Sequence, residues 1–307
     1  MIQITNLTKK FGDFVAVDNL NLEIKAGDIV GFLGPNGAGK STSMKMITGF
    51  LEPSSGEIKI NDKNLKAAPI EIKQKIGYLP EGAPAYGDMT VLQFLSFIAD
   101  TRGLKKAQKK QKLQEVVDKV ELQSVLNRQI DNLSKGFKRR VGLAQAIIHD
   151  PQVLILDEPT DGLDPNQKHQ VRALIKNLSK DKIVIISTHI LEEVSAVCNR
   201  AVIIAKGKKV FDGTPFELQS KSKYNQALNV EFEGQLPDIS QLKLAPGVTD
   251  VVQRTDTMIS ILSHESYGNI FPQIMDLIHL QGWSIKAMYN EQGQLDDVFR
   301  ELTQEVA

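Results

Sequence analysis

The sequence predicts an α/β protein with a mixed sheet, a helical insert and a second, smaller α+β domain towards the C-terminal end. Continuous apolar runs at 29–33, 153–156 and 183–186 are typical of parallel strands that are buried on both faces. Helical periodicity replaces this pattern between about residues 91 and 140. After a polar stretch at 219–223, strand-like alternation of apolar and polar residues begins again, which indicates a second domain.

The first domain is expected to cover residues 1–217. The run at 29–33 leads into a glycine-rich loop and then a helical stretch, and the runs at 153–156 and 183–186 supply two more strands. Strands and helices that alternate along the chain in this way pack as layers around a sheet. This part of the chain is therefore predicted to be a layered α/β fold.

The helical insert is predicted from apolar residues that recur at i, i+3, i+4 and i+7, the spacing of an amphipathic helix. One segment carries Leu92, Leu95, Phe97 and Ile98, and the next carries Leu113, Val116, Val117 and Val120. A further helix is expected at 138–149, directly before the strand at 153–156.

The second domain is expected to cover residues 221–307. Its elements, in order, are a strand beginning at Leu228, a strand near 258–262, a helix that aligns Ile270, Ile274, Leu277 and Ile278, a strand after Gly282, and a closing helix at 295–302. This order predicts a small antiparallel α+β sandwich. Its polar residues form no nucleophilic, metal-binding or phosphate-binding pattern, so an accessory role is expected.

Composition indicates an ordinary soluble protein, because 41% of the 307 residues are hydrophobic and 24% are charged. The 37 basic and 37 acidic side chains cancel, and no nucleic-acid partner is expected. The basic run at 105–112 lacks interleaved aromatic residues and is read as a solvated helix face. A single cysteine, Cys198, excludes an internal disulfide, and no signal segment or membrane-spanning run is evident, so a cytoplasmic location is expected.

A phosphate-binding loop is the clearest motif in the chain. The sequence GPNGAGKST at 34–42 lies between the predicted strand at 29–33 and a helix. Its glycines let backbone N–H groups close around phosphate oxygens, Lys40 can reach the β- and γ-phosphates, and the Ser41 hydroxyl can hold Mg²⁺. The residues expected to bind a nucleoside triphosphate here are Asn36, Gly37, Ala38, Gly39, Lys40, Ser41 and Thr42.

Two adjacent carboxylates, Asp157 and Glu158, follow the apolar strand at 153–156. Ligands of α/β proteins bind at the carboxyl edge of a parallel sheet, where these side chains are placed. Asp157 suits the coordination sphere of Mg²⁺, and Glu158 can polarise a water for in-line attack on a γ-phosphate. Two surface acids that close a strand are the structural alternative.

Two weaker signals lie elsewhere. Ser134 and Gly136 precede a helical run and offer a hydroxyl, an amide and a helix N-terminus, which suits a second phosphate site. An ordinary serine N-cap explains the same residues. His189 follows the strand at 183–186 and could hydrogen-bond a γ-phosphate, although a histidine at a strand end is also a common structural residue.

Taken in order, these motifs resemble the ATPase subunit of ATP-binding-cassette (ABC) transporters throughout residues 1–217. The resemblance implies a P-loop NTPase cassette that uses ATP and Mg²⁺. It places Ser134 and Gly136 in the signature loop, Asp164 in the D-loop and His189 as the switch histidine. Glu81 stands where the family usually has glutamine and is expected near Mg²⁺ or the attacking water. Phe11 matches the aromatic residue that stacks on adenine, with Phe14 as a possible substitute.

The resemblance also implies partners. A signature loop closes on the nucleotide of another subunit, so a homodimer or paired cassette is expected. The tail at 295–302 resembles the extension of multidrug, lipid, polysaccharide and gliding-motility export cassettes, whose membrane subunits are separate chains. This predicts a peripheral protein on the cytoplasmic face of the membrane, which couples through residues 81–90. Two alternatives remain: a soluble cassette ATPase that acts on ribosomes or DNA, and a non-hydrolysing ATP switch. The transported substrate is not encoded here.

Overall fold

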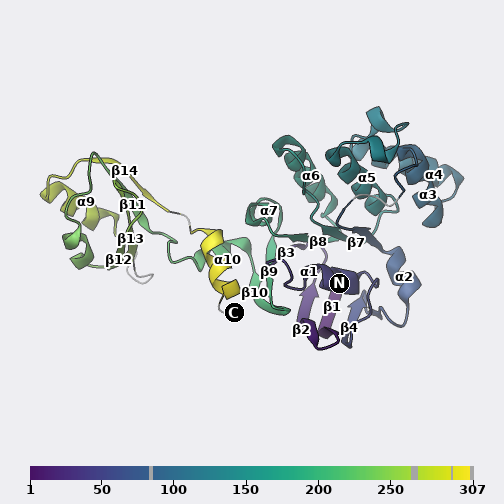
Figure 1. The fold of residues 1–307 in the computed structure, drawn as a ribbon, viewed down its shortest axis with the longest axis horizontal. Coiled ribbons are helices and arrows are strands. Elements are labelled where there is room, and N and C mark those ends of the chain that lie inside the picture. The colour runs from purple at the N-terminus through teal and green to yellow at the C-terminus, as the bar shows by residue number, and fades with distance from the viewer. Residues whose placement is uncertain (83–85, 264–268, 292, 305–307) are drawn as a thin grey trace. The chain divides into compact units, whose positions relative to one another are not determined.

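A computed structural model describes residues 1–82, 86–263, 269–291 and 293–304 of the chain (Figure 1). Contacts between Cα atoms divide the chain into two compact units. The first comprises residues 1–215 together with the chain from Leu302 onward, and the second comprises residues 216–301. The predicted fold class is confirmed: the first unit is a layered α/β fold and the second is a small α+β fold.

The first unit contains two sheets. The antiparallel sheet has the order β2 (Phe14–Ile24), β1 (Ile2–Phe11), β4 (Ser55–Ile60) and β5 (Lys63–Asn64). The six-stranded sheet has the order β10 (Lys208–Gly213), β9 (Arg200–Ala205), β3 (Ile29–Leu33), β8 (Ile183–Thr188), β7 (Val153–Asp157) and β6 (Ile76–Leu79). All of its neighbouring pairs are parallel except β10 and β9. The three predicted apolar runs are thus β3, β7 and β8, and they are buried along their whole length.

One core of the first unit lies between the two sheets, where α1 (Lys40–Ile47) contacts β2, β7 and β8. The short helix α2 (Pro69–Gln74) contributes Ile72 to the same core. On the other side of the six-stranded sheet lie α5 (Lys135–Ile147), α6 (Pro165–Leu178) and α7 (Leu191–Val197), as Figure 1 shows. Covering both faces is what continuously apolar parallel strands require.

The predicted helical insert contains α3 (Val91–Thr101), α4 (Lys106–Lys119) and the start of α5. Helix α3 begins with a capping box, because Thr90 Oγ1 accepts from the Gln93 amide and Gln93 Oε1 accepts from the Thr90 amide. Most of the basic run at 105–112 lies on α4, where Lys109 and Lys112 form ion pairs with Asp100 and Glu115. The predicted helical reading of that run is confirmed.

The second unit begins within α8 (Pro215–Ser220) and is built on an antiparallel sheet of order β12 (Val248–Gln253), β13 (Met258–Ser263), β11 (Leu228–Phe232) and β14 (Ile285–Asn290). Helix α9 (Phe271–Leu280) buries Ile274 and Ile278 in a core with Leu228 and Val230. Helix α10 (Leu295–Gln304) follows β14. Strand β12, helix α8 and a short 3-10 helix at Ser240–Leu244 were not predicted from the sequence pattern.

His149, two residues after the end of α5, gives the fold a pH-dependent stability. Its Nε2 lies 3.1 Å from the Ile76 carbonyl oxygen, while its Nδ1 is buried without a partner among the described residues. Burial, and then the positive charge of Arg102, lower the pKa of His149 from 6.5 to about 4. Because the unfolded chain takes up a proton at pH 6.5 that the folded chain resists until about pH 4, stability falls as the pH drops through this window.

We therefore expect the free energy of unfolding to lose up to about 3 kcal/mol between these two pH values through His149 alone. Urea titrations at several pH values measure this loss. The His149→Gln variant keeps a donor for Ile76 but cannot titrate, so its pH dependence should be shallower. His169→Gln changes an exposed histidine and serves as the control. Equal slopes in the wild type and His149→Gln would contradict the assignment.

Candidate nucleotide-binding site

The phosphate-binding loop leads from β3 into α1 without a side-chain cap. Gly39 occupies the N-cap position with φ 103°, and the first turn of the helix carries no acidic residue. The amides at this helix end therefore remain available for an anion. Glycine is required at 39, because φ is left-handed and a Cβ atom there would lie 2.4 Å from the Ala16 carbonyl oxygen. Asn36 and Gly37 are exposed on the loop, and Ala38 is buried beneath it.

Lys40 is folded back onto its own loop. Its Nζ donates to the carbonyl oxygens of Gly34 at 2.7 Å and Pro35 at 3.1 Å, and the residue is 7% exposed. Burial lowers the pKa of Lys40, while the carboxylates of Glu158 and Asp157 act in the opposite direction. The ammonium group thus has two neutral partners that a phosphate could replace.

Asp157 ends β7 and is 2% exposed. Its register partner on β8 is Ser187, which is fully buried and whose Oγ has no hydrogen-bond partner among the described residues. Ser43 of α1 likewise has a buried, unpartnered Oγ. Buried hydroxyls normally find a partner, so polar groups left unsatisfied near this strand end are compatible with a bound ion and its waters.

Glu158 and His189 meet at the carboxyl edge of the sheet. His189 Nδ1 lies 2.9 Å from Glu158 Oε1. An ionised carboxylate only accepts, so Nδ1 carries the proton in this hydrogen bond. The backbone of Glu158 is left-handed, with φ 50°, and its amide donates to the Ser187 carbonyl oxygen. The predicted base and the predicted switch histidine are therefore brought together.

Glu193 of α7 braces the segments that carry these two residues, and sequence reasoning did not single it out. Its carboxylate accepts from the hydroxyl of Thr160, two residues after Glu158, and from Thr188 Oγ1 at 2.9 Å, next to His189. Glu193 is 3% exposed, and burial raises its pKa. The only signal in the sequence was a charged residue inside an apolar helix stretch.

We expect Glu193→Ala to destabilise the fold by about 2–4 kcal/mol, because two buried threonine hydroxyls would lose their acceptor. Glu193→Gln keeps the shape and one carbonyl acceptor, so it should cost about 1 kcal/mol or less. Urea unfolding measures both effects. Glu192→Ala is the control, since its side chain is 78% exposed and it pairs with Arg172 at 3.1 Å, the same arginine that lies 4.0 Å from Glu193, so it tests the loss of that ion pair without the loss of the threonine contacts. An alanine variant at 193 as stable as the wild type would refute the bracing role.

The predicted signature and D-loop residues form a separate group. Ser134 is the exposed N-cap of α5, and its Oγ accepts from the Phe137 amide at 3.4 Å. Asp164 is the N-cap of α6, and its Oδ1 accepts from the Gln167 amide at 2.9 Å. A Cβ atom on Gly136 would lie 2.4 Å from the Gln167 side chain, so the two helix N-termini are neighbours. Nothing in the described chain places this group in contact with the loop at 34–42.

Phe11 and Phe14 face each other across the turn between β1 and β2 and are 50% and 63% exposed. One side of the Phe11 ring is covered by Lys9 Nζ, 5.2 Å from the ring centroid. Glu81 lies just beyond β6 and is exposed. Of the segment 81–90 that was expected to couple to a membrane partner, residues 83–85 lie outside the described residues.

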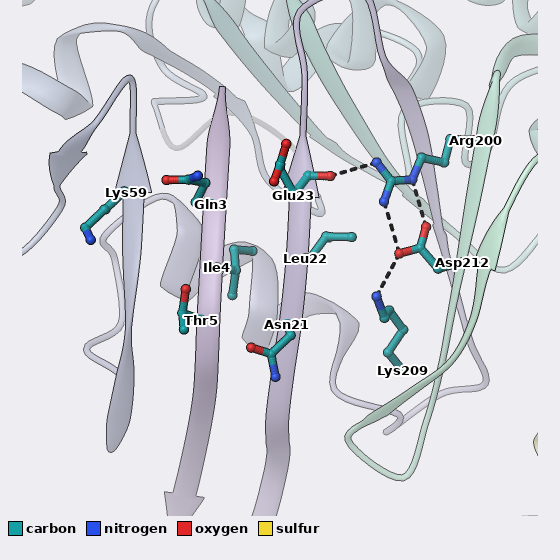
Figure 2. Close-up of a pocket in the computed structure, with 10 residues that line it drawn as sticks. All are labelled: Gln3, Ile4, Thr5, Asn21, Leu22, Glu23, Lys59, Arg200, Lys209 and Asp212. Atoms are coloured by element: carbon teal, nitrogen blue, oxygen red, sulfur yellow. Dashed lines mark hydrogen bonds and ion pairs between the residues drawn. The ribbon is translucent and has the colours of Figure 1, made fainter.

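A polar hollow of about 600 Å³ lies on the antiparallel sheet and at the β9–β10 edge (Figure 2). Its charged groups satisfy one another: Arg200 pairs with Asp212 at 2.7 Å and donates to the Glu23 carbonyl oxygen, and Lys209 also pairs with Asp212. None of the predicted site residues lines it. We assign this cluster to joining the two sheets.

A phosphate-binding loop between the buried strand β3 and a helix, with two carboxylates at the end of β7, a parallel strand of the same sheet separated from β3 by β8, defines the P-loop nucleotide-binding class. Comparison with known proteins agrees. Residues 17–161 match the family model described as ABC transporter. The Nod factor export ATP-binding protein I of Cupriavidus metallidurans is 36% identical over 219 residues, which cover 71% of this chain and 72% of that protein. The bacitracin transport ATP-binding protein BcrA of Bacillus licheniformis is 35% identical over 266 residues, covering 86% and 85%. The chain belongs to the ATP-binding proteins of the ABC transporter family.

Longer relatives and solved structures extend this result. The probable multidrug ABC transporter ATP-binding protein YbhF of Escherichia coli is 38% identical over 223 residues, but this match spans 72% of the present chain and only 38% of YbhF. A structure described as the ATP-binding subunit of an ABC transporter superimposes with a TM-score of 0.67 at 28% identity, covering 72% of this chain and 92% of that chain. A dimeric ATP-binding cassette in a post-hydrolysis state with ADP and Pi superimposes with a TM-score of 0.65 at 25% identity, covering 70% and 99%. Among the described helices, none is long and apolar enough to cross a membrane.

Proposed function

We propose that this protein is the ATP-binding and ATP-hydrolysing subunit of an ABC export system whose membrane-spanning subunits are separate chains. The observation that carries the proposal is the 2.9 Å contact between Glu158 and His189. The carboxylates of Glu158 and Asp157 both interact electrostatically with the ammonium group of Lys40. A base held by a histidine beside a phosphate-binding lysine suits water attack on a phosphate. This arrangement of base, histidine and lysine gives little support to the alternative of a non-hydrolysing ATP switch.

ATP is the proposed substrate. The uncapped backbone amides at the N-terminus of α1 would bind its phosphates. Lys40 would exchange the carbonyls of Gly34 and Pro35 for phosphate oxygens, and Phe11 would stack on the base. Glu158 would accept the proton of the attacking water, with His189 orienting its carboxylate. The remaining loop contacts are assigned to Asn36, Gly37, Ala38, Gly39, Ser41 and Thr42.

Mg²⁺ fits the same edge of the sheet. The buried carboxylate of Asp157 and the hydroxyl of Ser41 are oxygen donors of the kind that Mg²⁺ prefers, and Glu81 is a third candidate. Among the residues that the structure describes, no cluster of three His, Cys, Asp or Glu side chains could hold a metal without the phosphates. When bound, the ion would neutralise phosphate charge and align the γ-phosphate for attack. The unpartnered Ser187 hydroxyl is available to its waters.

We further propose that two copies close on two nucleotides, each through Ser134, Gly136 and Asp164 of the opposite copy. Support comes from the exposure of Ser134 and from the dimeric state described for the similar cassette with ADP and Pi. The second unit is proposed to be an accessory that tunes dimerisation or coupling. The proposed function includes no nucleic-acid partner.

A groove of about 730 Å³ is the proposed attachment point of the membrane subunit on the cytoplasmic face. It is lined by Phe50 and Ile70, which are 78% and 75% exposed, and by Tyr78 of β6. Burial, and then the charges of Asp157 and Glu81, raise the pKa of Tyr78 to about 12. The groove therefore includes β6, and the proposed site residue Glu81 follows that strand in the chain.

Two measurements test the proposal. Phosphate release from ATP with Mg²⁺ by the purified chain tests hydrolysis. For the partner, Phe50→Cys places one accessible thiol in the groove, because the native Cys198 is buried and burial raises its pKa to about 12. Crosslinking in cells should capture a protein with several membrane spans, whereas Leu244→Cys, equally exposed on the second unit, should not. Capture of a ribosomal protein would favour the soluble alternative.

A further inference from the structure

Arg139 is a buried arginine whose partners are almost all backbone carbonyls. It lies on α5, five residues after Ser134, and is 7% exposed. Nη1 donates to the carbonyl oxygens of Pro80 at 3.1 Å and Gly82 at 3.2 Å. Nη2 donates to the carbonyl oxygens of Asp157 and Glu158. Nη1 therefore donates to the segment that follows β6, and Nη2 donates to the end of β7.

Within the described residues, the four hydrogen-bond partners of the guanidinium are all backbone carbonyl oxygens, and its Nε has no partner. Burial lowers the pKa of Arg139, while the fields of Asp161 and Asp157 oppose this effect. A buried charge without a carboxylate partner is costly. The charge is compensated by four carbonyl dipoles where the two strands end, of which the Glu158 carbonyl also accepts from the Asp161 amide.

We propose that Arg139 is a positioning residue that ties the Glu81 segment and the catalytic end of β7 to α5, so that Glu158 follows any movement of that helix. As a statement about catalysis, this rests on the proposed function. Ser134 lies about 7.5 Å along the same helix, at the end proposed to meet the partner copy. Engagement of Ser134 by the opposite nucleotide would thereby reach the base of the subunit's own site.

Only an arginine can make these contacts. Its two terminal nitrogens are fixed in one plane and point to separate strands, whereas the three donors of a lysine radiate from a single atom. Arg139→Lys keeps the charge and most of the stem but should release one strand end. We expect kcat for ATP to fall about 10-fold or more while KM changes by no more than about threefold.

The decisive readout is independent of hydrolysis. In the nucleotide-free full chain, amide hydrogen exchange at 79–82 and 157–161 should rise in Arg139→Lys while the rest of the described chain keeps its wild-type protection. Arg140→Lys is the control, because Arg140 on the same helix contacts Glu121 and Gln170 instead. Arg139→Gln, smaller and uncharged, is measured in parallel.

The possible outcomes separate the two proposals. A wild type that does not hydrolyse ATP refutes the proposed function, and the exchange experiment still decides the role of Arg139. Unchanged exchange in both segments overturns that role. So does a rise throughout the chain, or failure of both variants to fold, because either shows a general structural role. A local rise with normal KM and reduced kcat supports it.

Discussion

Purified Lys40→Ala should lose ATP binding, whereas Glu158→Gln should bind ATP and fail to hydrolyse it. Lys40 supplies a buried positive charge that its loop carbonyls only partly satisfy, so its removal should weaken ATP affinity about 100-fold or more, or ~3 kcal/mol. Glu158→Gln preserves the shape but removes the group that accepts the proton, and kcat should fall about 1,000-fold. Calorimetric titration with ATP and phosphate release separate the two variants.

The same pair of variants should differ in oligomeric state. With ATP and Mg²⁺, Glu158→Gln should accumulate as a dimer in size-exclusion chromatography, since the closed state no longer ends in hydrolysis. With ATP and Mg²⁺, Lys40→Ala should keep the oligomeric state that it has without nucleotide. Lys45→Ala is the control for the lysine, because Lys45 lies exposed in the last turn of the same helix. Turnover near the wild-type rate in Glu158→Gln would remove Glu158 from the role of base.

Mixing two inactive variants should restore activity, because each proposed site draws on both subunits. Ser134→Arg places a bulky charge at the exposed N-cap of α5, and Lys40→Ala disables the loop. A heterodimer of the two would retain one site with a native Lys40 and a native Ser134. With equal mixing, half of the dimers are mixed and half of their sites are intact, so up to about a quarter of wild-type turnover should return.

This second experiment needs its own proof of mixing. Two affinity tags, one on each variant, would isolate the heterodimer before phosphate release is measured. Recovered turnover supports sites shared between subunits. A verified heterodimer without any recovery would instead indicate that each chain contains a complete site.

The parts of the fold that the sequence predicted are those with an uninterrupted pattern. Strands β3, β7 and β8 are apolar at nearly every position, so burial on both faces could be inferred without further information. Strands β1 and β2 carry no comparable signal. Their pairing is broken by register shifts, and Asn6 and Asn19 adopt left-handed backbone, which interrupts the period of two. Strand β12 buries only Val251, too little for a clear alternation.

The candidate site divides in a similar way. The loop at 34–42 is contiguous, so its residue types and spacing were sufficient to predict a phosphate site. The contact between Glu158 and His189 joins two strand ends that parallel topology brings to one edge; the sequence placed each residue at a strand end but did not predict the contact. Arg139 and Glu193 could not be predicted, because their partners are carbonyls and hydroxyls on distant segments. A charged residue at apolar helix spacing was the available clue.

The left-handed backbone at Glu158 is a position where the residue that suits the fold best differs from the residue that the proposed reaction needs. Residues other than glycine, asparagine and aspartate adopt φ near 50° at a cost, of about 1 kcal/mol, that glycine would not incur. The proposed base thus stands at a position where glycine, which has no side chain to accept a proton, would fit the backbone at a lower cost in free energy. In a related chain, glycine or asparagine at this position would suit the same backbone conformation but would lack the carboxylate that the proposed reaction needs.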